Sequence, residues 1–175
     1  MEIWIETERL ILREYKESDW EAIHEYAQQE HILIYEAWGP NNKANTKAFI
    51  QEVLQSQKAI PRVSFELAII LQEEDKLIGG CGFRYDALEK DKGNLGYIIN
   101  PEYWRSGYAV EATKALIRYA ATELGVKTIE ATCDVLNLAS QAVLKHCGFF
   151  RVKLIRKDFE MKGRLRDTFV YEMNT

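Results

Sequence analysis

The chain has 175 residues, of which 47% are hydrophobic and 29% are charged, and its formal net charge is −4 at pH 7. This length favours a single domain over residues 1–175 with a sizeable core. The acidic balance and the lack of a basic stripe argue against nucleic acid as the main partner. The N-terminus has early acids and no uninterrupted apolar segment, so we expect neither a signal peptide nor a membrane partner.

The three cysteines, Cys81, Cys133 and Cys147, lie far apart in apolar runs and do not have the spacing of a metal site. Their odd number and the lack of a secretion signal indicate free thiols and a cytoplasmic location. We therefore expect them to be buried as small hydrophobic side chains, and we expect no metal.

The N-terminal part of the chain begins with a strand pattern and continues with a helix pattern. Residues 8–15 alternate as a strand does, and Ser18 with Glu21 matches a capping box at the start of a helix. The apolar face of that helix contains Trp20, Ile23, His24 and Ala27. An irregular aromatic stretch, residues 31–42, follows it.

A second helix is predicted over residues 43–57, and a β-hairpin over residues 65–71 and 77–85. The inward side chains of that helix are expected to be Phe49, Ile50, Val53 and Leu54. Residues 87–93 form a charged loop in this interpretation.

The C-terminal half predicts a strand, a long helix, a second strand, a short helix and a closing hairpin. The first strand is expected at residues 95–99, and the long helix follows the stretch 104–109 and continues to about residue 124. The remaining elements are expected at residues 128–135, 137–147, and 150–158 with 166–171. A strand–helix–strand unit implies parallel pairing, whereas hairpins imply antiparallel pairing. The fold class is therefore α/β with a mixed sheet.

The stretch from Trp104 to Ala109 is the most informative, because it joins a strand directly to the start of a helix through small residues. The first N–H groups of a helix have no partner within the helix, and they lie at the positive end of its dipole. Such a turn binds a phosphate group without a dedicated lysine. Small residues also occur at ordinary helix starts, so this motif alone leaves a purely structural interpretation open.

Several stretches together resemble the GNAT superfamily of acetyl-CoA-dependent N-acetyltransferases, and within it the RimJ/RimL-type branch. The similar stretches are TERLILREYKESDWEAI at 7–23, LGYIINPEYWRSGYAVEATKALIRYA at 95–120, NLASQAVLKHCGFF at 137–150 and KGRLRDTFVYEM at 162–173. The resemblance implies a central mixed sheet of about seven strands with a V-shaped splay, flanked by about four helices.

The resemblance also implies the cofactor, which is acetyl-CoA, and the residues that bind it. N–H groups from Trp104 to Val110 would bind the pyrophosphate, an amide near Ile98 or Ile99 would polarise the thioester, and Asn137 would bind the pantetheine arm. The implied cofactor-binding residues are Ile98, Ile99, Trp104, Arg105, Ser106, Gly107, Tyr108, Ala109, Val110 and Asn137. Trp104 stands where the superfamily usually has Gln or Arg, and His146 where the branch often has a lysine, for which Lys145 could substitute.

Ser140 is the catalytic residue that the resemblance implies, as a hydrogen-bond donor to the departing thiolate. Many superfamily members have a tyrosine four residues later, where this chain has Leu144, so Ser140 is expected to be the sole side-chain donor nearby. A serine in the first turn of a helix also often bonds only its own backbone, and that interpretation stays open.

The resemblance does not identify the general base. Asn94 stands where many relatives have a glutamate, and an amide cannot accept the proton. The alternatives are Asp134, which is expected at the end of a strand facing the groove, Glu36 in the aromatic stretch, and a water relay. Glu111 is more readily explained by its place in the first turn of a helix.

The expected acceptor is a primary amine, either the N-terminus of a ribosomal or other protein or a small molecule. Tyr35, Trp38, Arg84 and Tyr85 are the side chains that would line its pocket. Core packing is the competing explanation for them, and for Trp38 it is at least as good. Fold analogy alone suggests a homodimer. The alternative function is an acyl-CoA-binding module with little or no turnover.

Overall fold

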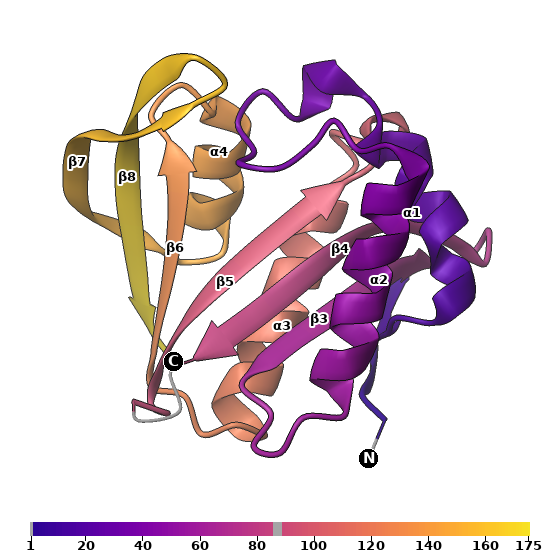
Figure 1. Ribbon diagram of the computed structural model, residues 1–175. Helices are drawn as coiled ribbons and strands as arrows, with labels where there is room; N and C mark the ends of the chain where they lie inside the picture. Colours follow the sequence, from indigo (N-terminus) through magenta and orange to yellow (C-terminus); the bar gives the residue numbers. More distant parts are fainter. Residues whose placement is uncertain (1, 86–88) are drawn as a thin grey trace.

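The computed structural model describes residues 2–85 and 89–175, and it contains an eight-stranded mixed sheet between two layers of helices (Figure 1). Helices α1 and α2 cover one face, and α3 and α4 cover the other. The strands, in the order β1-β2-β3-β4-β5-β6-β8-β7, are β1 Trp4–Glu6, β2 Leu10–Glu14, β3 Ser64–Leu71, β4 Lys76–Tyr85, β5 Lys92–Ile99, β6 Thr128–Asp134, β7 Phe150–Met161 and β8 Arg164–Asn174. The helices are α1 Trp20–Ala27, α2 Lys43–Gln57, α3 Tyr108–Thr122 and α4 Leu138–His146, with short 3-10 turns at Glu17–Asp19, Glu30–Ile32 and Pro101–Tyr103.

The central strands β3 and β4 are buried on both faces, which explains why they are apolar almost throughout, whereas β7 at the edge of the sheet is largely exposed. In β3, Leu67 and Ile69 pack on the α3 side, whereas Ala68 and Ile70 pack on the α1 and α2 side. Successive side chains of a strand point to opposite faces, so one strand serves two cores.

The two central strands separate after a short parallel contact. Lys92–Asn94 of β5 pairs with Thr128–Glu130 of β6, and beyond that point β6 continues to pair with β8 alone. Figure 1 shows β5 and β6 diverging toward the top of the molecule. The predicted V-shaped splay is therefore confirmed, and it leaves the upper part of β5 with an open edge.

Most predicted elements agree with the structure, and α2 has the predicted bounds. The strand β1 was not predicted, because three residues are too few to show an alternating pattern. The sheet consequently has eight strands where about seven were expected.

The capping box predicted from Ser18 and Glu21 is wrong. The chain turns first through the 3-10 segment Glu17–Asp19, and α1 begins at Trp20. The Asp19 carboxylate accepts hydrogen bonds from the Lys16 N–H and from the Arg13 guanidinium. This buried ion pair fixes the helix start, which the local pattern did not reveal.

The inward face predicted for α2 is correct for Ile50 and Val53, which are buried. Phe49 is 36% exposed and meets the ring of Tyr15 edge-on, so it lies at the margin of the core. None of the helices in the described part of the chain has the length and hydropathy that a membrane span requires.

Candidate functional site

The start of α3 presents a row of backbone donors. Gly107 is the N-cap residue with φ +82°, and the first helical hydrogen bond runs from the Glu111 N–H to the Gly107 carbonyl. Among the described residues, no hydrogen bond engages the N–H groups from Arg105 to Val110. Unpartnered amides at a helix start form an anion site.

Trp104 differs from its neighbours in this row. Its N–H donates to the Pro101 carbonyl (3.1 Å), and its indole nitrogen donates to the Ile99 carbonyl (2.7 Å). The expected series of amides therefore begins at Arg105, and Trp104 instead holds the loop against the end of β5.

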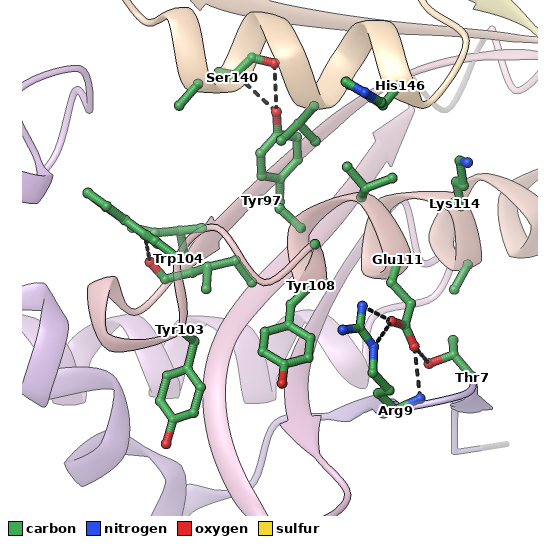
Figure 2. Close-up of a pocket in the computed structure, with 18 of the residues that line it drawn as sticks. Thr7, Arg9, Tyr97, Tyr103, Trp104, Tyr108, Glu111, Lys114, Ser140 and His146 are labelled. Carbon is green, nitrogen blue, oxygen red and sulfur yellow. Dashed lines mark hydrogen bonds and ion pairs between the residues drawn. The ribbon is translucent and has the colours of Figure 1, made fainter.

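An ion pair that the sequence analysis did not find supports this loop from below (Figure 2). Arg9 donates to the Ser106 carbonyl (2.9 Å) and pairs with Glu111, and its guanidinium lies 4.6 Å from the centre of the Tyr108 ring. Thr7 donates to the same carboxylate (2.7 Å). Burial alone would raise the pKa of Glu111, but the hydrogen bonds from Thr7 and Arg9 outweigh it and lower the pKa. Glu111 is thus a structural residue, as expected.

A cavity of about 1560 Å³ extends from this loop through the splay to the segment 31–36 on the opposite face of the sheet. Drug-sized ligands occupy pockets of about 300–1000 Å³, so this cavity suits a longer molecule. It is lined by all the predicted site residues except Ser106, namely Ile98, Ile99, Trp104, Arg105, Gly107, Tyr108, Ala109, Val110, Asn137 and Ser140. Ser106 contributes its carbonyl to Arg9 instead.

Several cationic side chains line the part of the cavity next to α3. Lys114 and Arg118 follow Val110 at helical spacing, and Arg9 and Arg105 flank the loop. His146 also lines the cavity, and its Nδ1 lies 2.7 Å from the Ala142 carbonyl, whereas Lys145 is not part of the lining. Glutamates line the cavity as well, and Arg9 is paired with Glu111, so Arg105, Lys114 and Arg118 are the cations that can meet a polyanion here.

The open edge of β5 distinguishes between Ile98 and Ile99. The Asn100 N–H donates to Ile78 on β4, whereas the Asp91 carbonyl accepts from Thr128 at the start of β6. Because backbone groups alternate along a strand, the Ile98 N–H faces β4 and the Ile99 N–H faces the gap. The amide that is directed into the splay is therefore that of Ile99.

At the other wall of the splay, the first turn of α4 holds Ser140. The side-chain oxygen of Asn137 caps the Ser140 N–H (3.0 Å), which leaves the Asn137 amide N–H₂ for a ligand. The Ser140 Oγ lies 3.0 Å from the Tyr97 hydroxyl, which also donates to the Ser140 carbonyl (3.2 Å). Burial is the main reason why the pKa of Tyr97 is raised, so the phenol stays protonated.

Ser140 is therefore not the sole side-chain donor at this point. Tyr97 comes from β5, and its hydroxyl lies close to the serine that was expected to act alone (Figure 2). The sequence analysis missed it because the two residues are 43 positions apart. Tyr97 projects from a strand that borders the splay, and that position is the signal that could have identified it.

The structure narrows the candidates for a general base. Asp134 is 1% exposed, pairs with Arg164, and accepts from the Leu136 N–H, so its predicted position facing the groove is wrong. Asn94 lies where β5 and β6 still pair, outside the cavity lining. Glu36 does line the cavity, and burial raises its pKa against the opposing effects of nearby cations.

The expected acceptor wall is only partly correct. Tyr35 lines the cavity together with Glu36, but Trp38, Arg84 and Tyr85 do not. The Trp38 carbonyl accepts from Lys162 (3.3 Å). Because β4 and β5 are antiparallel, Arg84 and Tyr85 lie beside the start of β5, at the closed end of the V. Tyr85 donates there to the Arg62 carbonyl (3.1 Å).

The two histidines of the N-terminal helical layer differ in position, because His31 lines the cavity and His24 does not. His24 Nδ1 lies 3.0 Å from the Thr46 hydroxyl, in agreement with a structural role. Within residues 2–85 and 89–175, no three His, Cys, Asp or Glu side chains are grouped as metal ligands.

Comparison with known proteins agrees with this geometry. A family model described as "Acetyltransferase (GNAT) domain" matches residues 9–150. The chain is 31% identical over 167 residues to the uncharacterized N-acetyltransferase YnaD of Bacillus subtilis, covering 95% of this chain and 94% of that protein. A GNAT-family acetyltransferase from Bacillus anthracis superposes with a TM-score of 0.86 at 28% identity over 98% of each chain. RimL, a ribosomal L7/L12 alpha-N-protein acetyltransferase in complex with coenzyme A, gives a TM-score of 0.86 at 19% identity over 98% of each chain, which is a likeness of fold.

Proposed function

We propose a mechanism on one premise, that this chain belongs to the GNAT family of acetyltransferases and is an N-acetyltransferase. It transfers an acetyl group from acetyl-CoA to a primary amine by direct attack within a ternary complex. The observation that carries this proposal is the row of unpartnered amides from Arg105 to Val110 beside the open edge of β5.

The coenzyme is bound by backbone donors more than by side chains. The amides around Gly107, at the positive end of the α3 dipole, bind the pyrophosphate, and Arg105 adds a charge-assisted contact. The pantetheine arm passes through the splay, where the Asn137 amide N–H₂ binds it.

The residues at the splay then act on the reacting groups. Acetyl-CoA supplies the acetyl group as a thioester. The Ile99 N–H donates to the thioester oxygen as negative charge develops on it. Glu36 accepts the proton that the amine loses, directly or through water, and Ser140 donates a hydrogen bond to the departing sulfur.

The acceptor enters from the face that carries Tyr35 and Glu36. A carboxylate at that entrance favours a cationic ammonium group, and the net charge of −4 also suits a basic acceptor. The fold likeness to RimL makes the N-terminus of a ribosomal or other protein the first class to test, and small amines are the second.

The test is release of free coenzyme A thiol from acetyl-CoA in the presence of an amine panel. The panel contains peptides with small N-terminal residues, basic peptides and polyamines, each paired with its N-acetylated form as a control. We expect thiol release only with free amines, in a one-to-one ratio with acetylated product. If acetyl-CoA bound and no amine released thiol, the chain would act as an acyl-CoA-binding module and the transfer proposal would be wrong.

A further inference from the structure

The contact between Tyr97 and Ser140 joins two elements that otherwise separate at the splay. Tyr97 lies on β5 and Ser140 in the first turn of α4, and both line the cavity (Figure 2). The phenol lies within hydrogen-bond distance of both oxygens of Ser140, at 3.0 Å from Oγ and 3.2 Å from the carbonyl.

The phenol has one proton to donate, and Ser140 offers two acceptors. When Tyr97 donates to the carbonyl, its own oxygen is free to accept the Ser140 hydroxyl proton, which then points at the phenol and not at a ligand. When Tyr97 donates to Oγ, the Ser140 proton is free to rotate toward a ligand. The position of one phenolic proton thus sets the direction of the serine hydroxyl.

We infer that Tyr97 is a positioning residue that directs the Ser140 hydroxyl at the departing coenzyme A sulfur. This inference rests on the proposed acetyl transfer. The hydrogen-bond chain runs from Tyr97 to Ser140 to sulfur, and each donor polarises the next one. Tyr97 thereby occupies, from a strand, the place of a second hydroxyl that Leu144 cannot provide from α4.

The chemical balance of the step is complete without a proton lost from either residue. The C–N bond forms, the C–S bond breaks, and the electron pair of the broken bond leaves on sulfur. The proton of the amine passes to Glu36 or to water in the cavity. The thiolate is stabilised by the hydrogen bond from Ser140 and takes up a proton from water after release.

The surroundings of Tyr97 favour a donor that does not ionise. Burial is the main reason why the pKa of Tyr97 is raised, and the Glu36 carboxylate acts in the same direction, whereas Cys133 on β6 and Cys147 after α4 are neutral thiols near it. A phenol that remains neutral can donate a strong hydrogen bond without becoming a second negative charge next to the thiolate.

The alternative explanation is that Tyr97 only fastens α4 to β5. The substitution Tyr97→Phe removes one oxygen and keeps the ring that packs on the core. The matched control is Tyr85→Phe, because Tyr85 also donates to a single backbone carbonyl but lies outside the cavity lining.

The first measurement is single-turnover acetyl transfer with acetyl-CoA and the best amine of the panel. We expect Tyr97→Phe to slow transfer about tenfold, equivalent to about 1.4 kcal/mol, with unchanged acetyl-CoA affinity. In a Ser140→Ala background, the same change should cost less than about twofold, because the partner is already absent. An equal loss in both backgrounds, or no loss in either, would overturn the inference.

The second measurement does not depend on turnover. We expect the thiol of bound coenzyme A, titrated by its ultraviolet thiolate absorbance, to have a pKa below that of free coenzyme A titrated in the same buffer. Tyr97→Phe should raise that pKa and Tyr85→Phe should not. An unchanged thiol pKa in Tyr97→Phe would show a purely structural role. If the wild type acetylated no amine, the proposed function alone would fail, and the thiol titration would still decide the role of Tyr97.

Discussion

Gly107 is a residue at which a side chain is incompatible with both the backbone and the ligand. Its φ of +82° is in the left-handed region, and an added Cβ would lie 3.4 Å from the Arg9 guanidinium. Its amide belongs to the row that we propose binds the pyrophosphate. A substitution here therefore strains the loop and fills the anion site together.

We expect Gly107→Glu to reduce acetyl-CoA affinity at least a hundredfold, because the carboxylate repels the phosphates, while the fold is retained. Isothermal titration measures the affinity, and circular dichroism checks the fold. The matched control is Gly125→Glu, because Gly125 also has a positive φ (+69°) but follows α3 in open space. Equal acetyl-CoA affinity in Gly107→Glu and the wild type would contradict the proposed anion site.

Glu36 is the residue for which the pH dependence of transfer is most informative. Burial raises its pKa above the usual range, and a general base must be ionised to accept a proton. We expect kcat/KM for the amine to fall as the pH decreases through this raised pKa. Glu36→Gln should remove that fall at low pH and should lower the maximum value of kcat/KM at least tenfold.

The control for Glu36 is Glu52→Gln, the same chemical change at an exposed site on α2. A Glu36→Gln enzyme that kept the wild-type pH profile would leave a water relay as the explanation for proton removal.

At the level of elements, the C-terminal hairpin β7–β8 holds the segment from Leu33 to Trp38, which contains Tyr35 and Glu36. Lys162, in the turn between β7 and β8, donates to the carbonyls of Leu33 (2.6 Å) and Trp38 (3.3 Å). These two carbonyls lie on either side of Tyr35 and Glu36. The hairpin therefore fixes the segment that we propose forms the acceptor entrance, at a distance from the loop that binds the coenzyme.

We expect Lys162→Ala to raise KM for the amine about threefold to tenfold and to leave acetyl-CoA affinity unchanged, because only the acceptor segment loses its support. Steady-state kinetics and titration separate the two effects. Lys157→Ala is the control. Lys157 is exposed in the same hairpin, and its φ of +49° is close to the +51° of Lys162. A loss of acetyl-CoA affinity in Lys162→Ala would mean that the two ends of the cavity are coupled.

At the level of the whole molecule, the three cysteines report on the integrity of the core on the α3 side of the sheet. All are buried as free thiols, as the sequence analysis expected. Burial raises the pKa of Cys133 and Cys147 to about 11, so only about 0.1% of each is thiolate at pH 8. Thiol reagents attack the thiolate, so reaction requires the structure to open.

We expect Ellman's reagent to label less than one thiol per native chain on the timescale on which it labels all three in denaturant. Saturating acetyl-CoA should slow the native reaction further, because a ligand that binds the folded state suppresses opening. A thiol that reacts rapidly in the native chain would contradict the buried positions.

Local sequence patterns predicted the parts of the site that are contiguous in the chain. The loop before α3 and the Asn137 cap of α4 depend on neighbouring residues, and both were found. The sequence analysis did not predict the contacts between distant segments. Arg9 and Glu111 are 102 positions apart, and no periodicity relates them. The error at Arg84 and Tyr85 arose because antiparallel pairing reverses the strand direction, which places them at the closed end of the V.

The sequence by itself determined the turn at Gly107 and the order of all strands and helices except β1, because these depend on short-range spacing, and its motifs carried the resemblance to the family to which the chain belongs. Only the tertiary structure decided that Glu36 and not Asp134 lines the cavity, which N–H of β5 is directed into the splay, and which hydroxyl lies within hydrogen-bond distance of Ser140. The physical reason is that strand register and burial assign each side chain its neighbours, and both are properties of the assembled sheet rather than of any single segment.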